Sequence, residues 1–368
     1  MALFDAVFEG GGAKGVAFVG AMEILNGRGH RLRRYLGTSA GAITATLSAA
    51  GYSPAEMLSA VMEKTPDGKP RFSTFMDVPS ADVFPAALCR ESVLRKALAE
   101  IDIPLVPDAL EAKFGDMLLE RLLHTRVFAR MFSFVETGGF YAGRAFLAWI
   151  TEKLGTKGIA AGDTLADFNA KTGADLSLVA SDTSDMEMLV LNHRTAPKVP
   201  VAWAVRMSMS IPFVWQEVLW REEWGTYLGR AKKDNVIVDG GCLSNFPIRL
   251  IAETDEPIRD VMGDTDPNGA LNLGLLIDET KPVPGAADTA KTPLGVSSLR
   301  TIQRVSRLVD TLTGASDNEM IRRRTAEICR LPAKGYGTLE FGMEGERLDL
   351  FLQAGRDAMN RHLAGRGL

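Results

Sequence analysis

The chain has 368 residues, of which 46% are hydrophobic and 24% charged, and its formal net charge is −4. This composition is typical of a globular protein with a substantial core, and the mildly acidic balance gives no basis for a nucleic-acid partner. The three cysteines, Cys89, Cys242 and Cys329, are too few and too widely spaced for a disulfide framework or a cysteine metal site. We therefore expect a reducing compartment.

The N-terminal sequence has no basic segment followed by a long apolar stretch, so it does not predict a signal peptide. No run of about 18 apolar residues predicts a transmembrane helix. We therefore expect a cytoplasmic or peripheral membrane protein, and delivery as an effector stays open. Any membrane lipid would be reached from solution.

The first fifty residues predict alternating strands and helices. Residues 5–9 are a short apolar strand that ends at three glycines, and apolar spacing over 14–26 predicts a helix. A second strand is expected at 31–36 and a second apolar helix at 40–50. This order favours a parallel sheet covered by helices.

The next part of the chain, residues 53–137, predicts short helices separated by prolines. Within it, residues 114–135 mix Phe, Leu and Met with Arg121, Arg126 and Arg130. This pattern fits a mobile amphipathic cap that opens on a membrane, but the preferred interpretation is a core helix pair whose arginines extend to solvent. We treat residues 66–140 as a largely helical insertion or cap within a catalytic domain that spans 1–295.

Strand patterns return later, at residues 176–181, 187–192, 236–239 and 271–278. An amphipathic helix is expected around 296–325, with Arg300, Arg304 and Arg307 forming a solvated basic face. A closing helix is expected around 346–364. Residues 296–368 are therefore predicted to be a C-terminal helical segment packed on the same domain.

The sequence Gly37-Thr38-Ser39-Ala40-Gly41 fits the G-x-S-x-G pattern of a nucleophile elbow. A sharp turn from strand to helix projects the serine hydroxyl above the sheet, and the glycines let neighbouring backbone approach closely. The serine also begins a helix, where free N–H groups favour negative charge. Ser39 is the candidate nucleophile, and the alternative is an ordinary strand–helix turn that contains a serine.

The glycine-rich sequence from Gly10 to Gly15 follows the preceding strand, so in a parallel sheet it lies beside Ser39. Consecutive glycines expose N–H groups, which suits an oxyanion hole. Gly10, Gly12 and Gly15 also satisfy the dinucleotide pattern G-x-G-x-x-G, but the second strand lacks the acidic residue that such a site needs. The P-loop pattern fails because no Gly-Lys-Ser/Thr follows.

None of the four histidines is well placed to activate Ser39. His30 precedes the second strand, at the far edge of the sheet, and His124 and His362 lie in helical stretches. Only His193, at the end of a predicted hairpin, is kept as an alternative base.

Asp239 ends an apolar strand and is followed by two glycines that leave it accessible. A carboxylate that is shielded from water has a raised pKa and could accept the serine proton near neutral pH. The alternative is that Asp-Gly-Gly is an ordinary turn.

Together these motifs resemble those of the patatin-like phospholipases, which carry a glycine-rich loop, a G-x-S-x-G elbow and a distant D-G-G/A motif. The segment 206–212, with Asn245 and Pro247, is similar to further family motifs. The resemblance covers roughly residues 5–280. It implies an α/β fold, a three-layer α/β/α sandwich with a central mostly parallel sheet, and a Ser–Asp dyad that needs no histidine.

The resemblance also implies the roles of individual residues. Ser39 would be the nucleophile and Asp239 the base and later the acid, with an acyl-enzyme intermediate. The implied oxyanion hole consists of Gly10, Gly11, Gly12 and Ala40. The supporting motif residues are Lys14, expected to fix the loop, and Gly15, Gly37, Gly41, Gly240 and Gly241.

No metal or cofactor is implied. The expected partner is a membrane or micellar lipid, contacted peripherally, and an activating protein partner stays open. The leading hypothesis is a phospholipase A or lysophospholipase. A non-phospholipid esterase or triacylglycerol lipase would use the same dyad, and a catalytically silent lipid-binding protein would keep the fold without turnover; the intact motifs speak against the last alternative.

Overall fold

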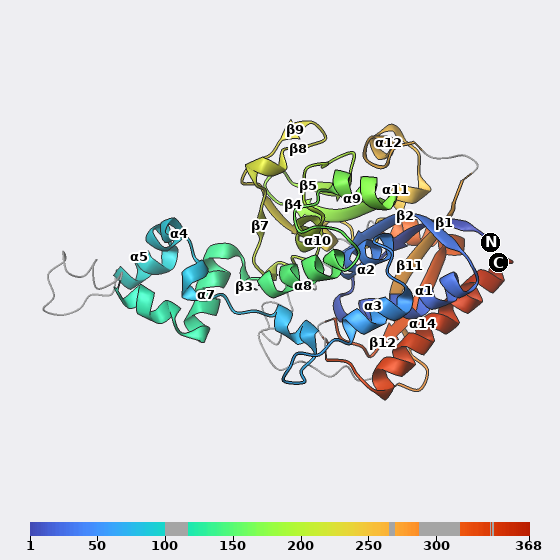
Figure 1. Cartoon of the computed structure of the whole chain (residues 1–368), viewed down its shortest axis with the longest axis horizontal. Helices are drawn as coiled ribbons and strands as arrows, with labels where there is room; N and C mark the ends of the chain where they lie inside the picture. The colour runs from blue at the N-terminus through green and yellow to red at the C-terminus, as the bar shows by residue number, and fades with distance from the viewer. Residues whose placement is uncertain (100–116, 265–268, 287–316, 339, 341) are drawn as a thin grey trace, which may run out of the picture.

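A mixed β-sheet lies between two layers of helices in the computed structural model, which describes residues 1–99, 117–264, 269–286, 317–338, 340 and 342–368 (Figure 1). The strands follow the order β12-β11-β1-β2-β4-β10-β7, and β5 also pairs with β4. These strands are β1 (Leu3–Phe8), β2 (Arg31–Thr38), β4 (Asp175–Asp182), β5 (Glu187–Leu191), β7 (Val218–Leu219), β10 (Val236–Asp239), β11 (Leu271–Pro282) and β12 (Ile328–Lys334).

The run from β12 to β4 is parallel, whereas β10 is antiparallel to β4 and β7, and β5 is antiparallel to β4. The sheet is therefore mostly parallel, as predicted, and every predicted strand is present. Two small sheets pair β3 (Gly139–Tyr141) with β6 (Phe213–Trp215) and β8 (Thr226–Tyr227) with β9 (Arg230–Ala231).

Helices cover both faces of the sheet. The larger core, on one face, contains residues of α1 (Val16–Gly27), α2 (Ala40–Ala49), α3 (Pro54–Val61), α8 (Arg144–Gly155), α9 (Leu165–Thr172), α10 (Val201–Ser208) and α14 (Glu346–Gly365). The other face packs against α11 (Arg249–Ala252), α12 (Glu256–Met262) and the helical residues 317–323. Short 3-10 helices are η1 (Gly12–Gly15), η2 (Arg71–Phe75), η3 (Ala81–Val83), η4 (Glu222–Trp224), η5 (Gly240–Cys242) and η7 (Thr325–Glu327).

The central strand β1 shows why both faces are covered. Phe4, Ala6 and Phe8 belong to the larger core, whereas Val7 belongs to the core on the other face. All four side chains are fully buried. Because successive side chains of a strand point to opposite faces, a strand with buried apolar side chains on both faces needs a helical layer on each side. The three-layer α/β/α sandwich is thus the observed fold.

A helical lobe projects from this sandwich at the left of Figure 1. It consists of residues 78–99 and 117–137, with α4 (Ala86–Glu91), α5 (Val93–Ala99), the helical residues 117–123 and α7 (Arg126–Thr137). It has a small core of its own, formed by Phe84, Leu119, Leu123, Ala129 and Phe132. Helices were predicted here, and they are confirmed in the described part; residues 100–116 lie outside it.

The C-terminal region corrects one prediction. Residues 317–323 and α14 are helical, but β12 pairs with β11 at the edge of the main sheet, so the description of 296–368 as a helical segment is wrong for these residues. Pro332 interrupts an apolar run in this strand, and proline is tolerated on an edge strand because its missing N–H need not face a neighbour. The predicted basic face of Arg300, Arg304 and Arg307 lies outside the described residues.

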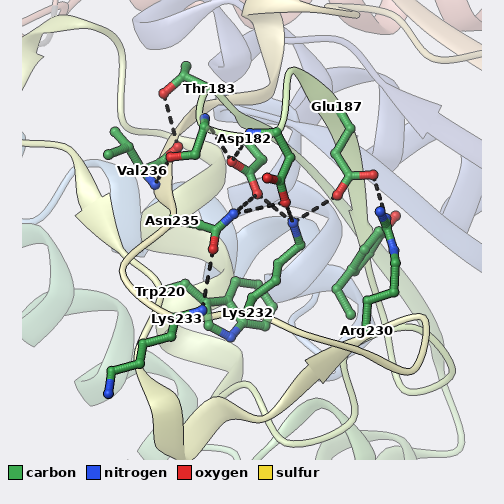
Figure 2. A network of polar contacts seen from close by, with 12 residues as sticks. Asp182, Thr183, Glu187, Trp220, Arg230, Lys232, Lys233, Asn235 and Val236 are labelled. Carbon is green, nitrogen blue, oxygen red and sulfur yellow. Dashed lines mark hydrogen bonds and ion pairs between the residues drawn. The ribbon is translucent and has the colours of Figure 1, made fainter.

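A polar network joins the β4–β5 turn to the segment that precedes β10 (Figure 2). The ammonium group of Lys232 forms ion pairs with Asp182 (2.6 Å), Asp185 (2.6 Å) and Glu187 (2.8 Å). The three carboxylates are close enough to hold a metal ion, and the lysine side chain fills that position. Burial lowers the pKa of Lys232, but the hydrogen bonds to the carboxylates outweigh it and raise that pKa.

The described helices include none with the length and apolar character needed to span a bilayer.

Candidate active site

Ser39 and Asp239 come together because two strands end against the same edge of β4. β2 runs parallel to β4 and its last residue, Thr38, pairs with Val179; β10 runs antiparallel and its last residue, Asp239, pairs with Ala180. Strand β5 occupies the other edge of β4 over both positions. The two strands therefore meet end to end, and the residue after β2 lies beside the last residue of β10.

The turn from β2 into α2 is sharp and closely packed. Ser39 has φ 54° and ψ −121°, a strained conformation for a residue with a side chain. A Cβ atom at Gly37 would lie 2.3 Å from the carbonyl oxygen of Gly41, and one at Gly41 would lie 2.1 Å from that of Phe8. The pattern G-x-S-x-G is therefore required here by close backbone contacts. Ser39 is 6% exposed.

The carboxyl group of Asp239 is buried and only partly satisfied. Its Oδ1 atom accepts a hydrogen bond from the Gly241 amide at 2.7 Å. Ser39 lies close enough to Asp239 to lower its pKa. The contact does not have the full geometry of a hydrogen bond, and Oδ2 has no hydrogen-bond partner among the described residues. Burial dominates and raises the pKa of Asp239 to about 7.

The glycine-rich loop is tied to the segment that follows Asp239. The Gly10 amide donates to the backbone oxygen of Asn245, and the Asn245 side-chain amide donates to the Gly10 oxygen, both at 3.0 Å. A Cβ atom at Gly10 would also lie 3.2 Å from Cβ of Ser39, so this loop lies beside the elbow, as predicted. The N–H of Gly10 is thus bound to Asn245 and is not turned toward a substrate in this arrangement.

The other three predicted donors are free. In the described ranges, the amides of Gly11, Gly12 and Ala40 donate to no acceptor, and Ala40 begins α2, where intrahelical partners are lacking. Lys14 is 3% exposed and pairs with Glu279 in the second half of β11, so its side chain joins the loop to that strand.

Two serines of the segment 206–212 hold this arrangement, and sequence reasoning gave them no role. The Ser208 hydroxyl accepts a hydrogen bond from the Ser39 amide at 3.0 Å and donates to the Val179 oxygen at 2.5 Å, at the point where β2 and β10 meet. The backbone oxygen of Ser210 accepts from the Asp239 amide at 2.9 Å. The occurrence of two serines in an otherwise apolar run was the only sequence feature that could have indicated these buried hydrogen bonds.

Asp317 is a second residue that the sequence did not reveal. Its carboxylate accepts hydrogen bonds from the Ser244 hydroxyl and from the amides of Asn245 and Phe246, each at 2.9 Å. Burial raises the pKa of Asp317 despite these donors. The carboxylate thus fixes the segment that holds the glycine-rich loop, and nothing in its local sequence predicts this contact.

The histidines lie away from the elbow. His193 precedes Arg194, which pairs with Asp175 at the amino end of β4 (2.7 Å). Ser39 lies near Val179, because the preceding residue Thr38 pairs with Val179. Val179 is four residues beyond Asp175 on β4, a distance of about 13 Å along a strand. Burial lowers the pKa of His193.

The remaining three histidines follow the predictions. His30 precedes β2 and accepts a hydrogen bond from the Ala2 amide. His124 is exposed in the helical lobe, and His362 is half-buried in α14.

An apolar pocket begins at Gly12 and Ala40, two of the residues with free amides. Its walls include Val19, Ile43, Leu47, Met57, Met62 and Met343. The pocket is narrow, about 70 Å³. Methionine side chains are flexible enough to move apart for a longer apolar group. The arrangement therefore offers an apolar chain a place next to the candidate oxyanion donors.

Comparisons with known proteins agree with the motifs. A family model described as patatin-like phospholipase matches residues 6–252. The uncharacterized protein YqhO of Bacillus subtilis is 32% identical over 267 residues, which cover 71% of this chain and 70% of that protein.

Two solved structures are also similar. VipD from Legionella pneumophila superimposes with a TM-score of 0.46 at 14% identity, covering 99% of this chain and 67% of VipD. ExoU from Pseudomonas aeruginosa, in its heterodimeric complex with SpcU, gives a TM-score of 0.40 at 18% identity. The match covers 100% of this chain and 52% of ExoU, so the chain spans about half the length of that protein.

Proposed function

The chain belongs to the patatin-like phospholipase family, and we propose that it is a lipid acyl hydrolase that cleaves carboxylic esters of phospholipids or lysophospholipids with a Ser39–Asp239 dyad. One observation carries the proposal: among the described residues Oδ2 of Asp239 is buried without a hydrogen-bond partner, and Asp239 has as its neighbour Ser39, which is held in a strained backbone conformation. A carboxyl group with a pKa of about 7 is well suited to general base catalysis near neutral pH.

The proposed reaction begins when the Ser39 hydroxyl rotates to donate to Asp239 Oδ2. Asp239 takes the proton as Oγ attacks the ester carbonyl, and the amides of Gly11, Gly12 and Ala40 supply donors for the developing oxyanion. Collapse of the tetrahedral intermediate expels the alcohol, which takes the proton back from Asp239. Water then loses a proton to Asp239 and attacks the acyl-enzyme. Collapse of this second intermediate releases the fatty acid, and Asp239 returns the proton to Oγ of Ser39.

The apolar pocket favours a substrate with a lipid acyl chain over a short polar ester. It begins at the proposed oxyanion donors, and an acyl chain whose carbonyl lay there could continue between Ile43, Leu47 and Met57. Burying methylene groups contributes about 0.8 kcal/mol each, so a longer chain should bind more tightly until the pocket is filled.

The nucleophile is tested by Ser39→Ala, with Ser48→Ala on the same helix as the matched control. The first variant should lose hydrolysis of a p-nitrophenyl ester and covalent labelling by a fluorophosphonate, whereas Ser48→Ala should keep both. Undiminished hydrolysis by the Ser39→Ala protein would refute the dyad.

The substrate class is tested separately, by mass spectrometry of the products formed from mixed lipids. Fatty acid together with a lysophospholipid is the expected result. Release from triacylglycerol alone would keep the dyad and reject the phospholipid. ExoU is found in a complex with SpcU; if the purified chain cleaves nothing, repeating the assay with cell lysate tests for an activating protein.

A further inference from the structure

The outer face of α7 is apolar, although it does not face the protein core. Val127, Met131 and Val135 follow one another at intervals of four residues, so they form one stripe along the helix. They are 74%, 47% and 44% exposed. We call these three residues the outer stripe.

The face of α7 that is buried is a different one. It carries Ala129, Phe132 and Ser133, which pack into the lobe core and against β3. A surface helix of a globular protein normally turns its apolar stripe inward. α7 therefore has two apolar faces, and only one of them has a partner among the described residues.

The exposed apolar side chains are concentrated in the helical lobe. Its described residues contribute Val93 and Met117 in addition to the outer stripe, all more than 40% exposed. The lobe projects away from the sandwich, as Figure 1 shows. Clustered exposed apolar residues on a projecting element are typical of an interaction surface.

The charge of the lobe indicates the partner. The described residues of the lobe, 78–99 and 117–137, contain six Lys or Arg and four Asp or Glu, in a chain whose net charge is −4. Arg126 and Arg130 are one turn apart and run parallel to the outer stripe. Neither arginine forms an ion pair with a described residue. The guanidinium group of Arg130 lies over the Tyr141 ring, 5.7 Å from its centroid, and its buried Nε atom lacks a hydrogen-bond partner within the described ranges. Both arginines, with His124, line a cavity of about 560 Å³ between α7 and residues 74–81.

We propose that the outer stripe of α7, with Arg126 and Arg130 beside it, is a docking surface for a bilayer that contains anionic lipid. The apolar side chains enter the boundary between headgroups and acyl chains, and the two guanidinium groups bind phosphate oxygens. An apolar row flanked by cations is complementary to such a surface.

The inner face of α7 connects this surface to the candidate active site. Gln216 donates to the Ser133 hydroxyl at 2.9 Å, and Arg206 donates to the Gln216 oxygen at 2.9 Å. Arg206 also donates to Ser210, whose backbone oxygen binds the Asp239 amide. Docking of α7 would therefore hold the site at a fixed position relative to the bilayer. The proposed function explains why the site would be held at a bilayer, and the inference rests on it only in this respect, because membrane binding itself needs no hydrolysis.

The test is vesicle flotation of the full chain in a Ser39→Ala background, so that no lipid is consumed. Vesicles of phosphatidylcholine alone are compared with vesicles that contain about 30% phosphatidylglycerol. The variants are Val127→Ser/Met131→Ser/Val135→Ser and Arg126→Gln/Arg130→Gln. The matched control is Met186→Ser, at a side chain that is 86% exposed on the β4–β5 turn.

The parent protein and the control should float with the anionic vesicles. The triple serine variant should bind them at least about 10-fold less, because three apolar side chains no longer leave water. The double glutamine variant should bind about 25-fold less, since each interfacial cation contributes about fivefold, and it should lose the preference for anionic lipid. Unchanged thermal unfolding midpoints would show that the variants are folded.

Three outcomes would overturn the proposal. One is that the parent protein does not bind anionic vesicles, and another is that both variants bind as well as the control. The third is that the parent is a dimer by light scattering and becomes a monomer in the triple variant, because a second copy would then cover the stripe. Since hydrolysis is not measured, a failure of the Ser–Asp dyad would leave these results unaffected.

Discussion

Asp182 and Asp239 lie on neighbouring strands and are equally hidden from solvent, yet their surroundings are opposite. Asp182 is 1% exposed and is bound by Lys232, by the Asn235 side chain and by the amides of Ser184 and Asp185 (Figure 2). Asp239 is 4% exposed and accepts a hydrogen bond from the Gly241 amide, and no cation of the described residues pairs with it.

The difference separates a structural carboxylate from one suited to chemistry. A buried charge that is paired on all sides joins segments of the fold and has no free lone pair to offer a substrate. A buried carboxylate left without its second partner has a raised pKa, and such groups gather at functional sites. Burial alone would not have distinguished the two residues; the number of partners does.

The largest effect is expected from Asp239→Asn. An amide cannot accept the Ser39 proton, so kcat for a p-nitrophenyl ester should fall about 10²–10⁴-fold, the usual contribution of a general base. The free energy of unfolding at pH 8 should not fall, because a neutral side chain replaces a carboxylate that is costly to bury. A near-normal kcat would show that Asp239 is not the general base, and His193 would then be the alternative to test.

The opposite result is expected from Lys232→Met. Removing the cation leaves Asp182 buried and unpaired, which should reduce the free energy of unfolding by about 3–5 kcal/mol, measured by urea denaturation. The folded fraction should keep its kcat. The control is Lys233→Met, at the next residue, whose side chain is 63% exposed. Its free energy of unfolding should change by no more than about 0.5 kcal/mol. Equal losses in the two variants would show that the ion pairs around Lys232 contribute little.

The pKa of Asp239 predicts a pH dependence with a defined sign. The folded-state pKa of about 7 lies above the ordinary value of 3.8, so the folded protein binds the extra proton between these two values. Stability from this group is complete below about pH 4 and is lost as pH rises to about 7, by on the order of 4 kcal/mol.

Unfolding of the parent and of Asp239→Asn should therefore be compared from pH 4 to 8. The variant should gain stability relative to the parent as pH rises through this window, and the parent's esterase rate should rise over the same range as Asp239 ionises. A stability difference that does not change with pH would contradict the raised pKa.

The smallest effect is expected from Ser208→Ala. The Ser39 amide and the Val179 oxygen would each lose a buried partner, at a cost of about 1–3 kcal/mol, and kcat should fall about 10-fold as the elbow loosens. Ser177→Ala, on β4 like Val179, removes a buried serine hydroxyl that accepts a hydrogen bond from the Asn192 side chain, and it should leave kcat unchanged. Because Asp239 is untouched, the pH midpoint of activity should stay the same; a shifted midpoint would mean that Ser208 acts on the base.

The sequence by itself determined the local features of this protein. The spacing G-x-S-x-G predicted the elbow at Ser39, because a backbone that turns this sharply has room only for hydrogen atoms at Gly37 and Gly41. Apolar periodicity predicted the strands and helices of the sandwich, since each element must bury one or both faces. The motifs also indicated the family that the comparisons show.

Only the tertiary structure decided which groups meet. β10 runs antiparallel to β4, so the rule that parallel strands end at one edge does not bring Asp239 to Ser39; the registers Thr38–Val179 and Asp239–Ala180 do. The same packing uses the N–H of Gly10, which the sequence had assigned to the oxyanion. Strand direction, register and hydrogen-bond partners depend on residues far apart in the chain, so a local sequence pattern cannot predict them.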